Sequence, residues 1–390
     1  MSERPLAILN IGLDRELLNR GTQTEAQQRQ LFYCRHLPAR IVHLVKAPAE
    51  CAPEPFDLAP NLRIVPCPVR HWAGFIPAAI SRGAALLGAE RYDLIQVQEP
   101  YLSGIVGAWL SRRHGVPLVV GLYSDEVDNP VWLAERWLNR FANVIGKAVL
   151  RRAAGTRTDS QAVAQRVACR GYRHLAYIPF LITHAERLVV ADAAAPSLRE
   201  QLLGGRPGPL LLAVSRLEAE KNLPLMLRAV AAAVERQPGL VLAVAGSGRH
   251  AETLAREAAA LLPGRVRWLG WVASDALAAY YQAADLMVIS SDRESAARVL
   301  TESLLAGTPV LSTDTAGARE VVEDSVSGRI VPVGDTTAYA QALIELTSDL
   351  GRLAQMGANG QQRMRASVTA EAVVAQLRNF YQGAMGAVAR

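Results

Sequence analysis

Short apolar runs recur along the whole chain, separated by longer segments in which apolar and polar residues mix. In the first half these runs predict strands at residues 6–11, 41–45, 63–66, 94–97 and 118–122. The second half repeats the pattern more clearly, and strands are predicted at residues 211–214, 241–245, 266–269, 286–289, 309–312 and 328–331. Helical segments are expected between them. Strands that alternate with helices are typical of α/β proteins with parallel sheets.

The length indicates two domains, since 390 residues exceed what one hydrophobic core usually supports. The break falls between residues 179 and 209, where turn and linker residues are frequent. We therefore predict two doubly wound, Rossmann-like domains facing each other across a cleft, at residues 1–182 and 209–366, joined by a linker at residues 183–208. In such sheets ligands bind beyond the carboxyl ends of the strands.

No apolar run approaches the roughly 18 residues that a membrane-spanning helix needs. The first residues enter a predicted strand directly, without the basic segment and apolar core of an export signal. The cysteines show neither Cys-x-x-Cys pairing nor histidines at zinc spacing, so we expect buried structural thiols. They are Cys34, Cys51, Cys67 and Cys169. These features predict a cytoplasmic protein.

Positive charge is concentrated in the first half of the chain. Residues 1–185 contain 22 Lys and Arg against 15 Asp and Glu, whereas the remainder contains 20 and 21. The excess indicates either an ordinary solvated surface or a surface that meets anionic lipid headgroups or a phosphorylated acceptor. Nucleic acid is not an expected partner, because no run of Lys and Arg with interleaved aromatic residues occurs.

Two segments of the first half combine aromatic, aliphatic and basic residues. Residues 71–80, flanked by Arg70 and Arg82, predict a buried helix, with contact at a membrane interface as the alternative. Trp132 and Trp137 are expected on one face of a single helix, and their spacing favours the core over lipid contact.

The segment between Glu294 and Glu302 gives the clearest indication of the chemistry. The first carboxylate is followed by the small residues Ser295, Ala296 and Ala297, and the second lies about two turns into a predicted helix. Small side chains at a helix start let a diphosphate approach the backbone N–H groups, where the helix dipole favours negative charge. The second carboxylate is then placed to meet ribose or sugar hydroxyls.

Basic residues and glycines follow two other predicted strands of the second half. Arg216 and Lys221 lie between a strand end and a helix start, which fits either a diphosphate clamp or ordinary surface charge. Gly246 and Gly248 follow the next strand and allow close backbone approach, although a lone Gly-x-Gly is weak support for a dinucleotide. No Asp-x-Asp signature occurs, so no metal site is predicted.

Taken in order, these motifs resemble the C-terminal domain of the retaining glycosyltransferases of family 4, the group 1 sugar-nucleotide-dependent enzymes with the two-domain GT-B fold. The resemblance covers residues 210–335 and is weaker elsewhere. The matching motifs are Ser215-Arg-Leu with Glu220-Lys-Asn, Ala245-Gly-Ser-Gly, Leu269-Gly-Trp-Val, Glu294 with Glu302, Ala316-Gly-Ala-Arg-Glu and the stretch from Gly328 to Asp335.

The resemblance implies a role for each matching residue. Arg216 and Lys221 would hold the phosphates of the leaving group, and Glu294 would lie beside the donor sugar. Glu302 would bind the ribose hydroxyls. The other donor contacts implied are Gly12, Gly246, Gly248, Val272, Ser295, Ala296, Ala297 and Arg298. The resemblance also implies a C-terminal helix, residues 367–390, that packs back on the first domain.

The chain departs from the family pattern in two places. Gly-Phe-Gly usually follows the first glutamate, whereas Ser295-Ala-Ala stands here, so the donor sugar is less predictable. No histidine base is carried over in the loop that follows residues 118–122. Asp125 and Glu126 lie in that loop, where they either orient an acceptor or belong to a solvated turn.

The expected function is retaining transfer of a sugar, of the hexosyltransferase type, from a nucleotide diphosphate sugar to an acceptor hydroxyl, without metal or cofactor. A lipid-linked or oligosaccharide acceptor in bacterial surface polysaccharide synthesis is expected. Peripheral contact of the protein with anionic lipid on the inner face of the cytoplasmic membrane is also expected. Two alternatives remain, a sugar-nucleotide epimerase or hydrolase of the same fold and a catalytically silent sugar-nucleotide-binding protein.

Overall fold

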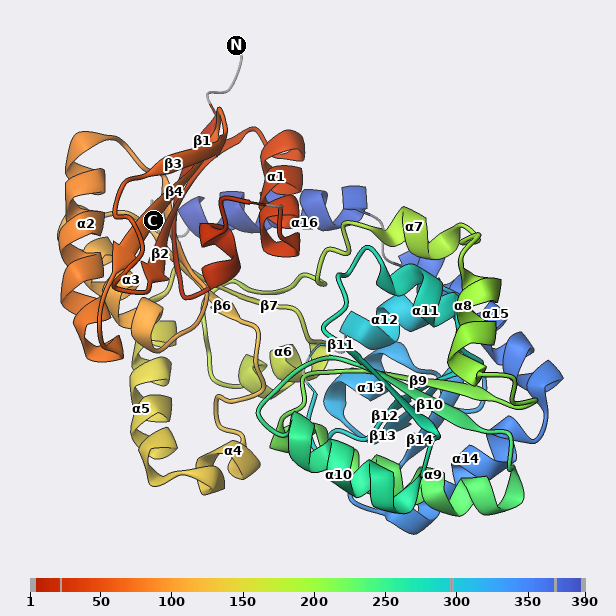
Figure 1. The fold of residues 1–390 in the computed structure, drawn as a ribbon. Helices are drawn as coiled ribbons and strands as arrows, with labels where there is room; N and C mark the ends of the chain where they lie inside the picture. The colour runs from red at the N-terminus through yellow and green to blue at the C-terminus, as the bar shows by residue number, and fades with distance from the viewer. Residues whose placement is uncertain (1–4, 22, 295, 297, 368–369, 387–390) are drawn as a thin grey trace. The chain divides into compact units, whose positions relative to one another are not determined.

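The computed structural model describes residues 5–21, 23–294, 296, 298–367 and 370–386. The chain forms two compact units, each with its own α/β architecture (Figure 1). Unit 1 comprises Met1–Thr183 and Ala370–Arg390, and unit 2 comprises His184–Thr369. The segment predicted as a linker, residues 183–208, instead contains the helices α7 and α8 of unit 2. Its Ala- and Pro-rich stretch starts α8 because Pro is tolerated in the first turn of a helix.

Unit 1 is built around one sheet. Its strands are β1 (Leu6–Gly12), β2 (Ala39–Ala47), β3 (Phe56–Ala59), β4 (Leu62–Pro68), β5 (Leu94–Val97), β6 (Leu118–Leu122), β7 (Gly155–Thr158) and β8 (Leu175–Tyr177). Its helices are η1 (Arg15–Leu18), α1 (Glu25–His36), η2 (Trp72–Gly74), α2 (Phe75–Ala89), α3 (Leu102–His114), α4 (Pro130–Glu135), α5 (Trp137–Arg152), α6 (Gln161–Ala168) and α16 (Ala370–Gly386).

The strands of this sheet lie in the order β3-β4-β2-β1-β5-β6-β7-β8, and among the described residues only β3 runs antiparallel to its neighbour. Alternate residues of β1 pack on opposite faces, since Ile8 belongs to one apolar cluster and Leu9 and Ile11 belong to another. Burial on both faces explains the continuous apolar runs in the sequence. The five strands predicted in this half are confirmed.

Unit 2 has a second sheet. Its strands are β9 (Leu210–Val214), β10 (Val241–Ala245), β11 (Val266–Gly270), β12 (Leu286–Ile289), β13 (Val310–Thr313) and β14 (Gly328–Val331). Its helices are α7 (Ala185–Val189), α8 (Ala195–Leu203), η3 (Ala219–Lys221), α9 (Leu223–Arg236), α10 (Ala251–Leu261), α11 (Leu277–Ala283), α12 (Arg298–Leu305), α13 (Ala316–Val321), α14 (Thr336–Thr347) and α15 (Leu350–Ser367).

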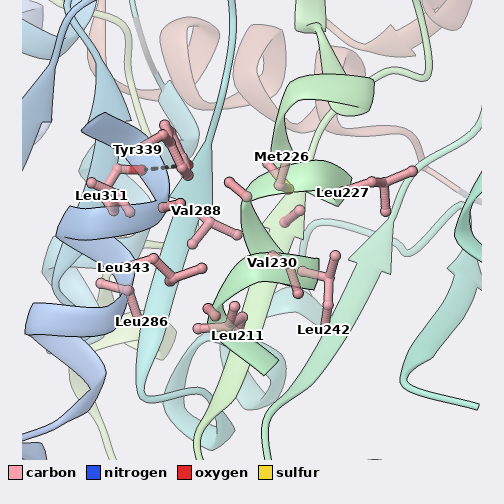
Figure 2. Packing of buried hydrophobic residues seen from close by; sticks show 14 of the residues in the cluster. Leu211, Met226, Leu227, Val230, Leu242, Leu286, Val288, Leu311, Tyr339 and Leu343 are labelled. Atoms are coloured by element: carbon pink, nitrogen blue, oxygen red, sulfur yellow. Dashed lines mark hydrogen bonds between the residues drawn. The ribbon is translucent and has the colours of Figure 1, made fainter. Parts of the chain in front are cut away.

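This sheet is parallel, in the order β11-β10-β9-β12-β13-β14, and its six predicted strands are confirmed. Figure 2 shows one face of its core, where strand residues such as Leu211 and Val288 pack against α9 and α14. Tyr339 of α14 donates a hydrogen bond to the carbonyl of Ile289 at 3.0 Å, so its buried hydroxyl is satisfied. The strand order is the doubly wound Rossmann arrangement.

The prediction that Trp132 and Trp137 share one buried helical face is wrong. Arg136 is extended (φ −147°, ψ 137°) and separates α4 from α5, so the two rings no longer have a common helical spacing. Trp132 is buried, whereas Trp137 is 69% exposed. Of the segment at residues 71–80, the part in α2 is anchored by buried Phe75, and Trp72 is exposed.

The cysteine prediction holds for only two of the four thiols. Cys34 and Cys67 are buried, but Cys51 is partly exposed and Cys169 is exposed. Cys169 follows the last residue of α6, outside the apolar clusters, which is why it reaches solvent. In the part of the chain that the structure describes, no helix is long and apolar enough to cross a membrane.

Candidate active site

The polar residues of unit 2 gather where its strand order reverses, at the carboxyl ends of the adjacent strands β9 and β12. Doubly wound sheets bind ligands at such switch points. The loops that follow the two strands are joined by hydrogen bonds. Asn222 Nδ2 donates to Asp292 Oδ1 at 2.8 Å, and the Ser290 hydroxyl donates to the carbonyl of Lys221 at 2.9 Å. The two loops therefore form one connected structure.

A lysine and a carboxylate from these loops form an ion pair. Lys221 Nζ lies 2.5 Å from Glu294 Oε1, and the two side chains are 13% and 15% exposed. The Ser291 hydroxyl donates to the same oxygen at 2.8 Å. The backbone N–H of Gly317, in α13, holds the carbonyl of Glu294 at 2.9 Å. Two of the predicted site residues thus meet. Two groups hold the Glu294 carboxylate, and a third holds its backbone carbonyl.

The backbone around Lys221 turns sharply. Asn222 adopts a left-handed conformation (φ 45°), which asparagine tolerates better than most residues. This turn ends η3 and starts α9, whose first turn contains a proline. The lysine is therefore presented at the start of a helix that is anchored in the core of unit 2.

The second predicted carboxylate is completely buried. Glu302, in α12, has 0% exposure. Arg298 Nε lies 2.8 Å from its Oε1, one helical turn away, and the hydroxyl of Tyr281 donates to its Oε2 at 3.0 Å. His184 Nε2 lies 3.6 Å from Oε1. The Arg298 side chain also reaches the hydroxyl of Ser274 at 3.3 Å. In this arrangement Arg298 covers the carboxylate that was expected to bind ribose.

Comparison with known proteins decides the family. Residues 196–363 match the family model described as "Glycosyl transferases group 1", and residues 25–180 match the "Glycosyl transferase 4-like domain". A D-inositol 3-phosphate glycosyltransferase from Salinispora arenicola is 31% identical over 80% of this chain and 73% of its own length. The chain belongs to the group 1 glycosyltransferases.

Other relatives of this group 1 glycosyltransferase are matched over less of their length. The D-inositol 3-phosphate glycosyltransferase of Salinispora tropica is 32% identical over 78% of this chain and 66% of that protein. The lipopolysaccharide core biosynthesis glycosyltransferase LpsE of Rhizobium meliloti is 27% identical over 55% of this chain and 60% of that protein. The chain thus spans under two thirds of these two relatives.

Solved structures share the fold of this group 1 glycosyltransferase. Sucrose-phosphate synthase from Thermosynechococcus elongatus has a TM-score of 0.82, 23% identity and coverage of 97% of this chain and 98% of that chain. Anabaena Alr3699/HepE in complex with UDP-glucose has a TM-score of 0.74, 21% identity and coverage of 97% and 98%. The two-domain, Rossmann-like GT-B prediction is confirmed.

Arg216 of this glycosyltransferase is not a member of the Lys221–Glu294 ion pair. Its side chain is 71% exposed and pairs with Glu220 Oε1 at 2.8 Å. Such a surface pair contributes little to stability, so the guanidinium is free to reach another anion. The predicted phosphate role of Arg216 stays a prediction.

The two glycines of the β10 loop have a structural reason for their small size. A Cβ on Gly246 would lie 1.8 Å from the carbonyl oxygen of Ser215, and one on Gly248 would lie 2.4 Å from that of Leu217. The backbones after β9 and β10 therefore pack directly against each other. Val272, after β11, is partly buried and follows the exposed Trp271. Donor contact at these positions stays a prediction.

The expected phosphate-binding turn is only partly described. Ser295 and Ala297 lie outside the described residues. Between them Ala296 is partly buried, and its carbonyl accepts a hydrogen bond from the N–H of Arg298 at 2.7 Å. The described part of α12 starts at Arg298.

The predicted residues of unit 1 lie at the end of β1 and in the loop that follows β6. Gly12 ends β1, and a Cβ there would lie 2.0 Å from the amide oxygen of Gln98, whose side chain accepts a hydrogen bond from the N–H of Leu13 at 3.1 Å. Asp125 forms an ion pair with Arg166 of α6. Glu126 lies near Tyr101; burial first, and then this carboxylate, raise the pKa of the tyrosine. The structure thus gives both acidic residues internal partners.

Sequence reasoning missed the groups that surround Glu302. His184 and Tyr281 belong to segments without a recognisable motif, and Arg298 was predicted as a donor contact and not as a partner of Glu302. The i,i+4 spacing of Arg298 and Glu302 was the one local signal available.

Proposed function

We propose that the chain transfers a glycosyl group from a nucleotide diphosphate sugar to an acceptor hydroxyl, with retention at the anomeric carbon and without a metal ion. The ion pair of Lys221 and Glu294 at the strand switch point carries this proposal. In this proposal Lys221 is the cation for the phosphates, and the neighbouring Glu294 carboxylate accepts hydrogen bonds from sugar hydroxyls. Membership of the group 1 glycosyltransferases supports the reaction class.

The proposed reaction builds negative charge on the leaving diphosphate, and its stabilisation is the largest electrostatic task. The bond between the anomeric carbon and the phosphate oxygen breaks as the acceptor oxygen forms the new bond on the same face. The acceptor proton passes to the departing phosphate oxygen. Lys221 is buried enough to act in a medium of low dielectric constant, and Arg216 can leave its surface partner to reach the phosphates.

A donor screen tests the proposal. We expect release of free nucleoside diphosphate when a matching donor and an acceptor hydroxyl are both present, and UDP-glucose is the first donor to try because a structural neighbour binds it. If free sugar is released as readily without an acceptor as with one, the chain is a hydrolase. If the donor is isomerised and no nucleotide is released, the chain is an epimerase. Donor binding by calorimetry without turnover for every acceptor would indicate a silent binding protein.

We further propose that the acceptor lies at a membrane, in bacterial surface polysaccharide synthesis. The support comes from α5 of unit 1 (Figure 1), in which several large apolar side chains are exposed to solvent. Asn143, Gly146 and Val149 face the interior, while Trp137 (69% exposed) and Phe141 (62% exposed) face solvent. Leu138, Val144 and Ile145 are also exposed.

The charge of α5 complements an anionic bilayer. The helix contains no acidic residue, and the exposed side chains of Arg140, Arg151 and Arg152 lie along it. Aromatic and aliphatic residues bordered by arginines are typical of segments that lie in a lipid interface. One relative, LpsE, is named as a lipopolysaccharide core biosynthesis glycosyltransferase, which supports a role in surface polysaccharide synthesis.

Co-sedimentation with phosphatidylglycerol vesicles tests this surface. We expect Phe141→Glu to reduce binding by at least about tenfold, because burying one large apolar side chain contributes roughly 1.5–3 kcal/mol. Trp271→Glu is the matched control, since Trp271 is an exposed aromatic residue in unit 2 (73% exposed). If Phe141→Glu leaves vesicle binding unchanged, the proposed membrane contact is wrong. Self-association that depends on Phe141 and occurs without vesicles would also count against the proposed membrane contact.

A further inference from the structure

A cavity of about 320 Å³, lined by both polar and apolar side chains, lies in unit 1 and is bounded by the sheet and by helices α1 and α16. At one edge it is lined by Asp14, Gln98, Tyr123 and Asp159, which follow the carboxyl ends of the adjacent strands β1, β5, β6 and β7. Ligands of parallel sheets enter at this edge. At about 30 Å³ per water molecule, the cavity has room for a small phosphorylated polyol.

A buried arginine lines the interior of this cavity. Arg157, on β7, is 5% exposed, and its Nε makes no hydrogen bond within the part of the chain that the structure describes. Its guanidinium carbon lies 5.6 Å from the centre of the Tyr123 ring. The guanidinium has a hydrogen bond with the side chain of Tyr33, and no carboxylate of the described residues forms an ion pair with it. A buried cation without a counter-ion is costly, which indicates that an anion completes the site.

The other cation of the cavity is already paired. Arg29 of α1 lies 3.9 Å from Asp14 Oδ2, and its guanidinium carbon lies 4.6 Å from the centre of the Phe180 ring. Arg157 is therefore the group that most needs an anion. A planar guanidinium also matches the oxygens of a phosphate better than an ammonium does.

Amide groups near Arg157 are suited to hydroxyls. Asn10 Oδ1 is buried and makes no hydrogen bond among the described residues. Gln96, on the neighbouring strand, accepts a hydrogen bond from the hydroxyl of Tyr381 at 2.6 Å, which orients its amide. The cavity thus combines a cation that lacks an anion with an acceptor that lacks a donor.

We propose that this cavity binds a phosphate-bearing polyol, with the phosphate on Arg157 and a hydroxyl on Asn10, and that this ligand is the part of the acceptor that unit 1 holds. The assignment to the acceptor rests on the proposed function. Asp125 and Glu126, the acceptor residues predicted from the sequence, are outside the cavity and have internal partners.

Calorimetric binding of glucose 6-phosphate, inorganic phosphate and glucose tests the site. We expect glucose 6-phosphate to bind most tightly and glucose most weakly, because the phosphate supplies the missing counter-ion. Arg157→Met should weaken glucose 6-phosphate binding about 10- to 100-fold, the loss typical of one charged hydrogen-bonded contact. Arg157→Lys should recover part of it.

Thr156→Val is the matched control. Thr156 is also buried on β7, but its side chain points to the opposite face of the sheet from Arg157 and does not line the cavity. The Thr156→Val variant should bind glucose 6-phosphate like the wild type. Circular dichroism shows whether each variant is folded. Equal binding by wild type and Arg157→Met, or no binding of glucose 6-phosphate by folded wild type, would overturn the inference. Glycosyl transfer is not the readout, so a failure of the proposed function would be seen separately.

Discussion

Lys221→Met is expected to lower the turnover number for glycosyl transfer by about 100- to 1000-fold, the usual effect of removing one group that stabilises developing negative charge. The change removes the cation proposed for the leaving diphosphate. It also leaves Glu294 with only the hydroxyl of Ser291 as a side-chain partner among the described residues. Steady-state kinetics with saturating donor measure the effect, because a loss confined to the transition state lowers kcat without a matching rise in KM.

Stability must be separated from chemistry in this variant. Breaking a buried ion pair costs about 3–5 kcal/mol, and less is expected here since both side chains keep some exposure. Arg228→Met is a suitable control, because Arg228 lies on α9 just beyond Lys221 and pairs with Glu257 at 3.3 Å on the surface. It should retain turnover. Near-wild-type turnover in folded Lys221→Met would contradict the proposed role.

The strands could be predicted because most of them are apolar over their whole length. β9, β10 and β12 are buried at every position, so burial alone determines their sequences. β7 does not stand out as an apolar run, because its sequence Gly-Thr-Arg-Thr places polar groups where the other strands have aliphatic ones. Arg157 is accommodated there by a cavity, which no local pattern reveals. The break at Arg136 also has no glycine or proline to mark it.

The residues of the candidate site could be predicted from the sequence, but the contacts between them could not. Lys221 and Glu294 carry motifs that the sequence displays, yet they are 73 positions apart, and only the adjacency of β9 and β12 brings them together. The surroundings of Glu302 are harder still to predict. His184 precedes α7 and Tyr281 lies in α11, so their approach to one carboxylate depends on packing within unit 2.

Arg298→Met is expected to lower the free energy of unfolding by about 3 kcal/mol, the low end of the range for removing one partner of a buried ion pair. Glu302 is fully buried, so its carboxylate would lose its charged neighbour on α12 without gaining water. The hydrogen bond from Tyr281 would remain, which is why the low end applies. Denaturation by urea, compared with the wild type, measures the change.

A second substitution separates a structural role from donor binding. If the cost arises from the uncompensated carboxylate, the double variant Arg298→Met with Glu302→Gln should recover most of the lost stability, because a neutral amide replaces the charge. If Glu302 also receives the ribose hydroxyls, Glu302→Gln alone should weaken calorimetric binding of UDP while Arg298→Met should not. The opposite result is that Arg298→Met unfolds like the wild type but no longer binds UDP. It would contradict the structural role of Arg298. The arginine would then bind the donor directly, and the pair with Glu302 would only hold its side chain in place.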